Sequence, residues 1–345
     1  MKILAIDTSC DETAAAITEN TRILSNVIWS QASAHAKFGG VMPSLAQRMH
    51  EERIDWVIEQ AIKRSKLKIQ NLDYLAVTIG PGLSIALGVG IDRARKLAEK
   101  YGKPLIAVNH LEGHLLSPLA NSDILNLKFP NLGLVISGGN TIFIKMNQLG
   151  SYEILAQTTD DALGEALDKA ARMLGLGYPG GAILEKLARL GNPKKFSLPI
   201  PLIGQENRQI FSYSGLKTSF YRLIEANKLK DLHFPSKHDV YDLAATFQNV
   251  AFTHLIRIIS YILKNDDTTY RDFFVGGGVS ANIEIRKRLR NLAKENGLQT
   301  HFPYTQRLCG DNAAMIGIAG YFYVTTGNLT KNPKEIDRDP NLKLS

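Results

Sequence analysis

The chain has 345 residues, of which 44% are hydrophobic and 21% charged; this composition excludes a mainly disordered protein, and the length favours two lobes over one core. The formal net charge of +8 at pH 7 favours a polyanionic partner, although many ordinary enzymes are as basic. Two cysteines make no disulfide framework and no apolar run is long enough to span a bilayer, so we expect a cytoplasmic protein with no membrane partner.

Strand and helix patterns alternate along the first third of the chain. Residues 2–30 predict a hairpin with a polar tip and no signal peptide before it. Residues 44–65 carry apolar side chains at helical spacing, and 72–82 predict a strand that runs into a glycine-rich turn. A helix over 82–102 and a strand over 104–110 follow, before another helix begins. This alternation predicts an α/β lobe, which we place at residues 1–125.

The next segments repeat this organisation, so we predict a second lobe at residues 126–325. Residues 131–146 form a second hairpin pattern, with an apolar strand on each side of a small glycine turn. Helical patterns cover 160–176, 214–228 and 239–264; 192–213 predict a long loop; and 271–297 predict a strand, a glycine loop and a helix. A last helix follows Cys309, which we expect to be a buried thiol, and the polar residues 326–345 predict a loosely packed tail.

His110 and His114 are the first candidate metal ligands. Histidines four residues apart on a helix lie on one face and can bind the same ion, although a polar helix face is the simpler alternative. Glu112 is two residues after the first histidine and not one, so the pattern is not that of a zinc protease. Two ligands are too few. Asp311 is the candidate third ligand, but an aspartate at the start of a helix can also be its cap.

Glycine turns provide candidate ligand-binding loops. Gly276–Gly278, followed by Ser280 and Asn282, exceeds what a tight turn requires, yet it matches neither a Walker loop nor a dinucleotide fingerprint. Ser137, Gly138 and Gly139 lie at the tip of the second hairpin, where backbone N–H groups can bind phosphate or simply form the turn.

Carboxylates are concentrated in two places. Asp11 and Glu12 lie at the tip of the first hairpin, where an ordinary polar turn is the alternative. A second cluster, around Asp168, adjoins lysine and arginine and can be a solvated, ion-paired helix face.

Long segments between residue 6 and about residue 322 resemble the bacterial tRNA N6-threonylcarbamoyladenosine transferase family in sequence and in order. This family was once labelled O-sialoglycoprotein endopeptidase. The matching segments are IDTSCDETAAAI, HAKFGGVMPSLAQR, GPGLSIALGVG, NHLEGHLLSP, LVISGGNT, DDALGEALDKAARMLGLGYPGG, FSYSGLKT, VGGGVSAN and CGDNAAMIGIAGY.

The resemblance implies a fold and a set of site residues. The fold would be two duplicated actin-, Hsp70- and sugar-kinase-like α/β lobes with a nucleotide-binding cleft between them. One metal ion per chain, iron or zinc, would be bound by His110, His114 and Asp311. The donor adenylate, L-threonylcarbamoyl-AMP, would contact Val135, Ile136, Ser137, Gly138, Gly139, Asp168, Gly181 and Asn282. Asp11 and Glu12 are candidates for a general base by position only.

The resemblance also implies an activity and partners. The family transfers threonylcarbamoyl to N6 of the adenosine just 3′ of the anticodon, in tRNAs that read codons beginning with A, and releases AMP. Its partners are tRNA, a paralogous actin-fold subunit that pairs through the N-terminal lobe, and a small P-loop ATPase. A non-catalytic ATP-binding scaffold is the alternative that this fold permits.

Four positions depart from the family pattern, and none is a proposed metal ligand. Asn140 stands in place of histidine, Ser44 of glutamate, Ile200 of arginine and Gly310 of threonine. These changes bear on activity more than on the fold.

Overall fold

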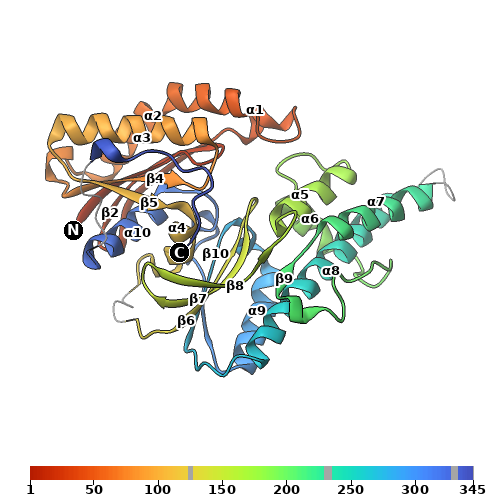
Figure 1. Ribbon diagram of the computed structural model, residues 1–345. Helices are drawn as coiled ribbons and strands as arrows, with labels where there is room; N and C mark the ends of the chain where they lie inside the picture. Colours follow the sequence, from red (N-terminus) through yellow and green to blue (C-terminus); the bar gives the residue numbers. More distant parts are fainter. Residues whose placement is uncertain (123–126, 229–234, 328–332, 345) are drawn as a thin grey trace.

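The computed structural model describes residues 1–122, 127–228, 235–327 and 333–344. Two α/β lobes lie side by side, and each contains one mixed β-sheet (Figure 1).

The first sheet has five strands in the order β3-β2-β1-β4-β5. β1 to β3 form an antiparallel meander, whereas β4 pairs parallel to β1 and β5 parallel to β4. The strands are β1 Lys2–Asp7, β2 Glu12–Glu19, β3 Arg22–Ser30, β4 Tyr74–Gly80 and β5 Leu105–Asn109. β1 is a nearly unbroken apolar run because helices cover both faces of the sheet there.

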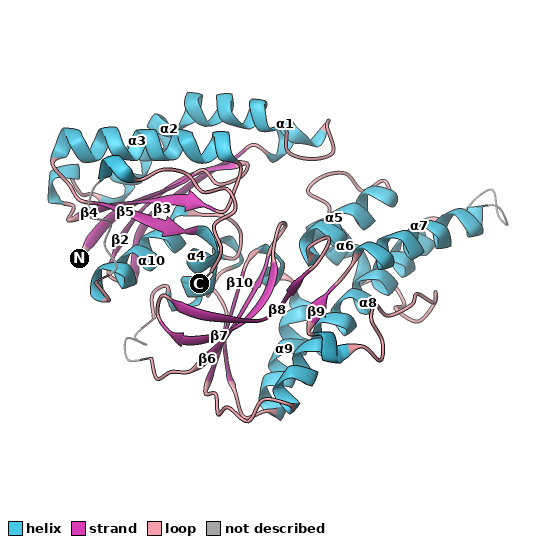
Figure 2. Ribbon diagram, viewed as in Figure 1, coloured by secondary structure: helices cyan, strands magenta, loops and turns pink. Residues whose placement is uncertain are grey.

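The helices around this sheet come from both ends of the chain. α2 and α3 cover one face, and α4 and α10 cover the other (Figure 2). The bounds are α1 Ala32–Ala36, α2 Pro43–Ser65, α3 Ser84–Tyr101, α4 His110–Leu116 and α10 Ala313–Thr325. α3 ends at Gly102, whose left-handed φ of 61° suits glycine, as the sequence predicts.

The second sheet has six strands in the order β11-β10-β6-β7-β8-β9. Its strands are β6 Asn131–Ile136, β7 Thr141–Gln148, β8 Ser151–Thr158, β9 Ile210–Phe211, β10 Asp272–Gly276 and β11 Gln299–His301. The helices packed on it are α5 Leu163–Met173, α6 Gly181–Ala188, α7 Ser214–Lys228, α8 Lys237–Lys264 and α9 Ile283–Glu295. β8 was not predicted, because its mostly half-exposed side chains give little apolar pattern.

The two sheets have the same topology. In the second, β6 to β8 form the antiparallel meander, and β10 and β11 continue in parallel from β6, as β4 and β5 do from β1. β9 is an additional short strand at the β8 edge. This repetition confirms the predicted fold class of two duplicated α/β lobes.

α10 connects the lobes. It lies within the range that the sequence assigns to the second lobe, but it packs on the first sheet, where Gly317 lies against Thr18 and Gly320 against Ala76. The core around α10 and α4 also includes Val135 of β6, so this core is shared by both lobes. The segment just before α10 is therefore held between the two sheets.

The C-terminal segment corrects one prediction. A loosely packed tail was expected over 326–345, but residues 333–344 lie along the first lobe, with Ile336 and Leu344 buried. The backbone N–H of Asp339 donates to a carbonyl of β4 at 2.8 Å. Composition misled here because a few apolar side chains and backbone hydrogen bonds anchor an otherwise polar segment.

Candidate active site and metal centre

α4 brings the two histidines together. The helix begins directly after β5, and the side chain of Asn109 caps it by accepting a hydrogen bond from Leu111 N at 2.8 Å. Every residue of α4 is buried. His110 and His114 therefore stand one turn apart on a fixed helix, with ring centroids 4.6 Å apart.

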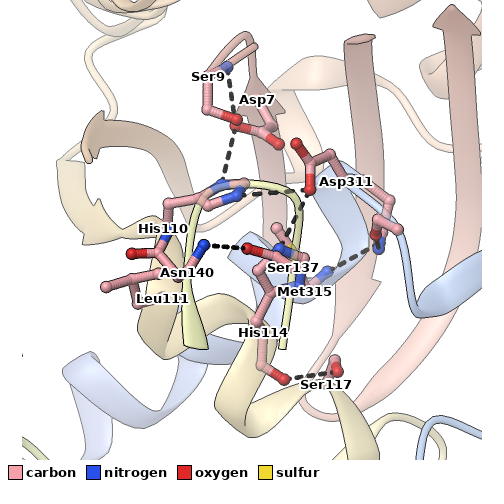
Figure 3. Close-up of polar contacts among 12 residues, drawn as sticks. Asp7, Ser9, His110, Leu111, His114, Ser117, Ser137, Asn140, Asp311 and Met315 are labelled. Atoms are coloured by element: carbon pink, nitrogen blue, oxygen red, sulfur yellow. Dashed lines mark hydrogen bonds and ion pairs between the residues drawn. The ribbon is translucent and has the colours of Figure 1, made fainter. Parts of the chain in front are cut away.

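Asp311 faces both histidines. The cap of α10 is Asn312, which accepts a hydrogen bond from Met315 N at 3.1 Å, so Asp311 is not the cap. Its Oδ1 lies 3.5 Å from His110 Nε2 and 3.1 Å from His114 Nε2 (Figure 3). The potential ligand atoms of the three residues all lie within 4.8 Å of one another.

The chemistry of this group fits a metal ion. Two imidazole nitrogens and one carboxylate oxygen are a common set of protein ligands at catalytic sites, where a fourth position stays open. Asp7 Oδ1 lies 3.7 Å from His110 Nδ1, as an outer carboxylate does behind a ligating histidine (Figure 3). Within the described ranges, His114 Nδ1 and Asp7 Oδ2 are buried without a hydrogen-bond partner, which indicates that the polar group is incomplete.

Electrostatics keep Asp311 ionised. Burial acts to lower the pKa of His110, but the charges of Asp311 and Asp7 outweigh it and raise that pKa to about 10. Burial also acts to raise the pKa of the Asp311 carboxyl, yet the His110 cation holds it well below its usual range. Burial lowers the pKa of His114. These shifts favour the Asp311 carboxylate and the neutral His114 imidazole, which are the forms that coordinate a metal ion.

His110 and Asp311 border a large cleft. A cavity of about 600 Å³ is lined by the first hairpin tip, the turn after β4, the second hairpin tip and α5. It includes His110 and Asp311, together with Asp11, Glu12 and Asn140. The acidic first hairpin tip and the glycine-rich second hairpin tip are far apart in sequence but line the same cleft.

The first hairpin tip is held by His50 of α2. His50 Nδ1 lies 2.8 Å from Thr13 Oγ1, and its Nε2 lies 3.0 Å from the carbonyl oxygen of Cys10. At this tip, burial and then the negative charge of Asp311 raise the pKa of Glu12 well above its ordinary value. A carboxylate in such a place is a stronger base than one in water.

A smaller cavity of about 240 Å³ adjoins the cleft and shares Gly138, Asp168, Pro179 and Gly278 with it. Asp168 Oδ1 accepts a hydrogen bond from Gly181 N, at the start of α6, over 2.6 Å. Gly138 and Gly278 leave open space where a side chain would begin, so a ligand can approach the backbone closely there.

The other residues predicted to contact the donor adenylate have different surroundings. The side chains of Val135 and Ile136 are fully buried on opposite faces of β6, away from the cavities. Ser137 closes the hairpin turn, where its Oγ accepts a hydrogen bond from Asn140 N. Asn282 lines the smaller cavity, but its Oδ1 caps α9 and its Nδ2 donates to Gln248 Oε1 at 2.8 Å.

The carboxylates near α5 divide into two kinds. Asp161 and Glu165 pair with Lys169, which fits the solvated ion-paired face that the sequence left open. Glu165 and Lys169 also line the large cleft, whereas Asp168, on the same helix, lines both cavities.

Two segments of the site were missed from the sequence. Tyr178 and Pro179 line the cleft although their turn alone required no function, and so does the turn Pro81–Leu83. A glycine-rich turn directly after a buried strand was the available signal for the latter. Among the positions that depart from the family, Asn140 lines the cleft, whereas Ile200 packs against the core of the second lobe.

The family-model match and the curated relatives agree on one family. Residues 22–318 match the family described as tRNA N6-adenosine threonylcarbamoyltransferase. A protein of that name from Bartonella tribocorum is 44% identical over 337 residues, covering 93% of this chain and 89% of its own length. Another from Clostridium kluyveri is 42% identical over 349 residues, covering 100% and 98%.

Among solved structures, the ROK hexokinase from Thermus thermophilus is similar at 16% identity and a TM-score of 0.46, covering 95% of this chain and 100% of that one. In the described ranges, no helix combines the length and apolarity needed to cross a membrane.

Proposed function

The chain belongs to the tRNA N6-adenosine threonylcarbamoyltransferase family, and we propose that it transfers threonylcarbamoyl from L-threonylcarbamoyl-AMP to N6 of an adenosine in tRNA. The acceptor is the adenosine just 3′ of the anticodon in tRNAs that read codons beginning with A, and AMP is released. The observation that carries this proposal is the convergence of His110, His114 and Asp311 beside a cleft with an adjoining smaller cavity.

His110, His114 and Asp311 would hold one iron or zinc ion. Bound there, the ion supplies a Lewis acid for the carbamoyl oxygen or an anchor for the threonyl carboxylate. The chain's own part is to keep Asp311 ionised and to hold both imidazoles on a buried helix, so that the ligands need little rearrangement.

The smaller cavity would hold the nucleoside part of the donor. Asp168, Gly181 and Asn282 border it, and Gly138 of the second hairpin tip lines both it and the cleft. The backbone N–H groups of Gly138 and Gly139 are suited to offset the charge on the leaving phosphate. That of Ser137 already donates to the Asn140 carbonyl at 2.8 Å. The donor's carbamoyl group would then extend toward the cleft.

The reaction forms one bond and breaks one. The N6 lone pair attacks the carbamoyl carbon, and the bond from that carbon to the phosphate oxygen breaks, so AMP leaves with the electron pair. N6 also loses a proton. Glu12 and Asp11 line the same cleft and are the candidate acceptors of that proton. An adenine amino group is a weak nucleophile, so alignment in the cleft contributes much of the acceleration.

A non-catalytic scaffold would use the fold but would not need this site. A scaffold function does not explain why two buried imidazoles and a carboxylate converge beside the cleft. A paralogous actin-fold subunit and a small P-loop ATPase are part of the same proposal, as is a cytoplasmic location, and they rest on family membership.

The experiment is reconstitution. The wild-type chain, threonylcarbamoyl-AMP, unmodified tRNA and the partner proteins should yield threonylcarbamoyladenosine, measured by mass spectrometry of digested tRNA. Asp311→Ala should reduce the product by more than the roughly 100-fold that loss of an outer-sphere group can cost a metal site. Asp267→Ala, which changes an exposed aspartate in a loop of the second lobe, is the matched control and should keep wild-type activity.

Asn140→His distinguishes the remaining outcomes. If the wild type is active, this substitution should change the rate only modestly, because Asn140 lines the cleft without belonging to the ligand group. An inactive wild type that Asn140→His does not rescue, with donor and partners verified on a related enzyme, would contradict the proposed catalysis and favour the scaffold.

A further inference from the structure

Glu112 lies between the two histidines in sequence but belongs to a different environment. Its side chain is 5% exposed and borders a separate cavity of about 320 Å³ that neither His110 nor Asp311 lines. Oε1 accepts a hydrogen bond from the Tyr152 hydroxyl, and Oε2 accepts one from the Tyr323 hydroxyl. Both carboxylate oxygens are therefore bound, each by a different tyrosine.

The two tyrosines come from elements that are distant in sequence. Tyr323 lies in α10 on the first lobe, and Tyr152 lies in β8 on the second. Glu112 itself lies in α4. One buried carboxylate thus joins the histidine-bearing helix to the helix that follows Asp311, and joins both to the opposite lobe.

These are the elements that place all three candidate metal ligands. His110 and His114 are on α4. Asp311 comes directly before Asn312, the cap of α10. The histidines of α4 meet Asp311, which lies just before α10, while Glu112 of α4 and Tyr323 of α10 meet at a separate cavity. The pair is consequently fixed at two separate points.

Stability alone does not account for this arrangement. A buried carboxylate has a desolvation cost that its hydrogen bonds only offset, and well-packed apolar side chains in such places are often equally stable or more so. Two directed hydrogen bonds do, however, restrict how α4 can rotate or slide against its neighbours, which apolar packing does less well.

We propose that Glu112 is a positioning residue, which through Tyr323 sets the spacing between the α4 histidines and Asp311 and through Tyr152 ties that spacing to the second lobe. This inference rests on the metal site of the proposed function. Its consequence is that removing a hydroxyl on the far side of α4 changes the metal site without altering any ligand.

The test uses conservative variants of the full chain and Co²⁺ as the probe. Tyr323→Phe and Glu112→Gln keep the size of the side chain and remove or weaken the hydrogen bond. Each should raise the Kd for Co²⁺, measured by competition with a chelator, by about tenfold, the lower end of what outer-sphere groups contribute. The visible spectrum of bound Co²⁺ should change as well, because it reports ligand geometry. Tyr152→Phe should have a smaller effect, since β8 carries no ligand.

Two reference variants make the result specific. Tyr270→Phe also removes a tyrosine hydroxyl bound to a carboxylate, that of Asp266, but in a loop of the second lobe, and it should leave Kd and spectrum unchanged. The double variant His110→Ala, His114→Ala defines the signal without a site. Urea unfolding of every variant separates loss of the fold from loss of geometry.

The outcomes distinguish this inference from the function on which it rests. If wild type binds one Co²⁺ and Tyr323→Phe and Glu112→Gln match Tyr270→Phe in Kd and spectrum, the positioning role is wrong and the proposed metal site stands. If wild type binds no more Co²⁺ than the double histidine variant, the metal site is wrong and the positioning role falls with it.

Discussion

His254 shows how one buried side chain can make stability depend on pH. It lies on α8, is 1% exposed, and its Nε2 accepts a hydrogen bond from Ser212 N at 3.1 Å. The neutral imidazole is therefore the form that fits, and burial lowers the pKa of His254 to about 4. This contact holds the end of the long 192–213 loop against α8.

We predict a loss of stability in acid that depends on this residue. An unfolded histidine has a pKa of about 6.5, so below that pH the unfolded chain takes up a proton that the folded chain does not. The stabilisation is complete above pH 6.5 and falls as the pH is lowered toward 4, by about 3 kcal/mol. Urea unfolding across that range should show a shallower pH dependence for His254→Gln than for wild type.

His238→Gln is the control for this measurement. His238 is exposed near the start of the same helix, so its replacement should leave the pH dependence as in wild type. Equal slopes for His254→Gln and wild type would contradict the assignment of the acid sensitivity to His254.

At the scale of elements, the turn before α9 has both a structural and a proposed binding role. Asn282 Oδ1 accepts hydrogen bonds from Glu284 N at 2.9 Å and Ile285 N at 3.2 Å, and its Nδ2 is bound to Gln248. Both polar atoms are therefore used within the chain, and a donor in the smaller cavity would have to share them.

We predict that Asn282→Ala destabilises the protein by about 1–2 kcal/mol, because it removes a helix cap and leaves Gln248 without that partner. Asn282→Ser keeps a capping oxygen and should recover most of the loss in urea unfolding. Ser236→Ala, which removes the cap of α8 in the second lobe, is a matched control that should lower stability without changing binding of the donor. An Asn282→Ala variant as stable as wild type would show that the cap contributes little.

How much was predictable from the sequence depends on how local each feature is. The hairpins, α2 and α3 follow from apolar spacing and glycine stops, so the sequence predicts them within a few residues. The one-turn spacing of His110 and His114 is local as well. The approach of Asp311, about 200 residues later, is a tertiary contact that no spacing encodes, and the family resemblance supplied it. The bonds from Tyr152 and Tyr323 to Glu112 had no local signal at all.

At the scale of the whole molecule, charge is distributed unevenly between cleft and exterior. The wall of the large cleft carries more acid than base: Asp11, Glu12, Glu165, Asp168 and Asp311 against Lys169 and Arg172, besides His110. The net charge of the chain is nevertheless +8. The excess of positive charge therefore lies outside the cleft, so a polyanion is attracted to the exterior more than to the cleft wall.

The loop between α1 and α2 is the place where these two regions meet. Gly40 lines the cleft, and the Arg172 guanidinium donates to the carbonyl of Gly39, so this loop of the first lobe touches α5 of the second. Lys37 and Phe38 are exposed beside it. Phosphates that flank an inserted adenosine would pass close to this loop.

We predict that tRNA binding falls steeply with salt and that Lys37 contributes to the slope. Each phosphate contact adds about −0.7 to −0.9 to the slope of log K against log salt, so two contacts cost about tenfold between 50 and 200 mM. Lys37→Glu should weaken binding and flatten the slope by about one contact. Lys294→Glu, at an exposed position in the last turn of α9 in the second lobe, makes the same change of charge and should affect both much less. Filter binding or fluorescence anisotropy across a salt titration measures all three proteins. A flat titration for wild type would contradict electrostatic binding of tRNA. Equal effects of the two substitutions would agree with electrostatic binding but would show that the α1–α2 loop has no special part in it.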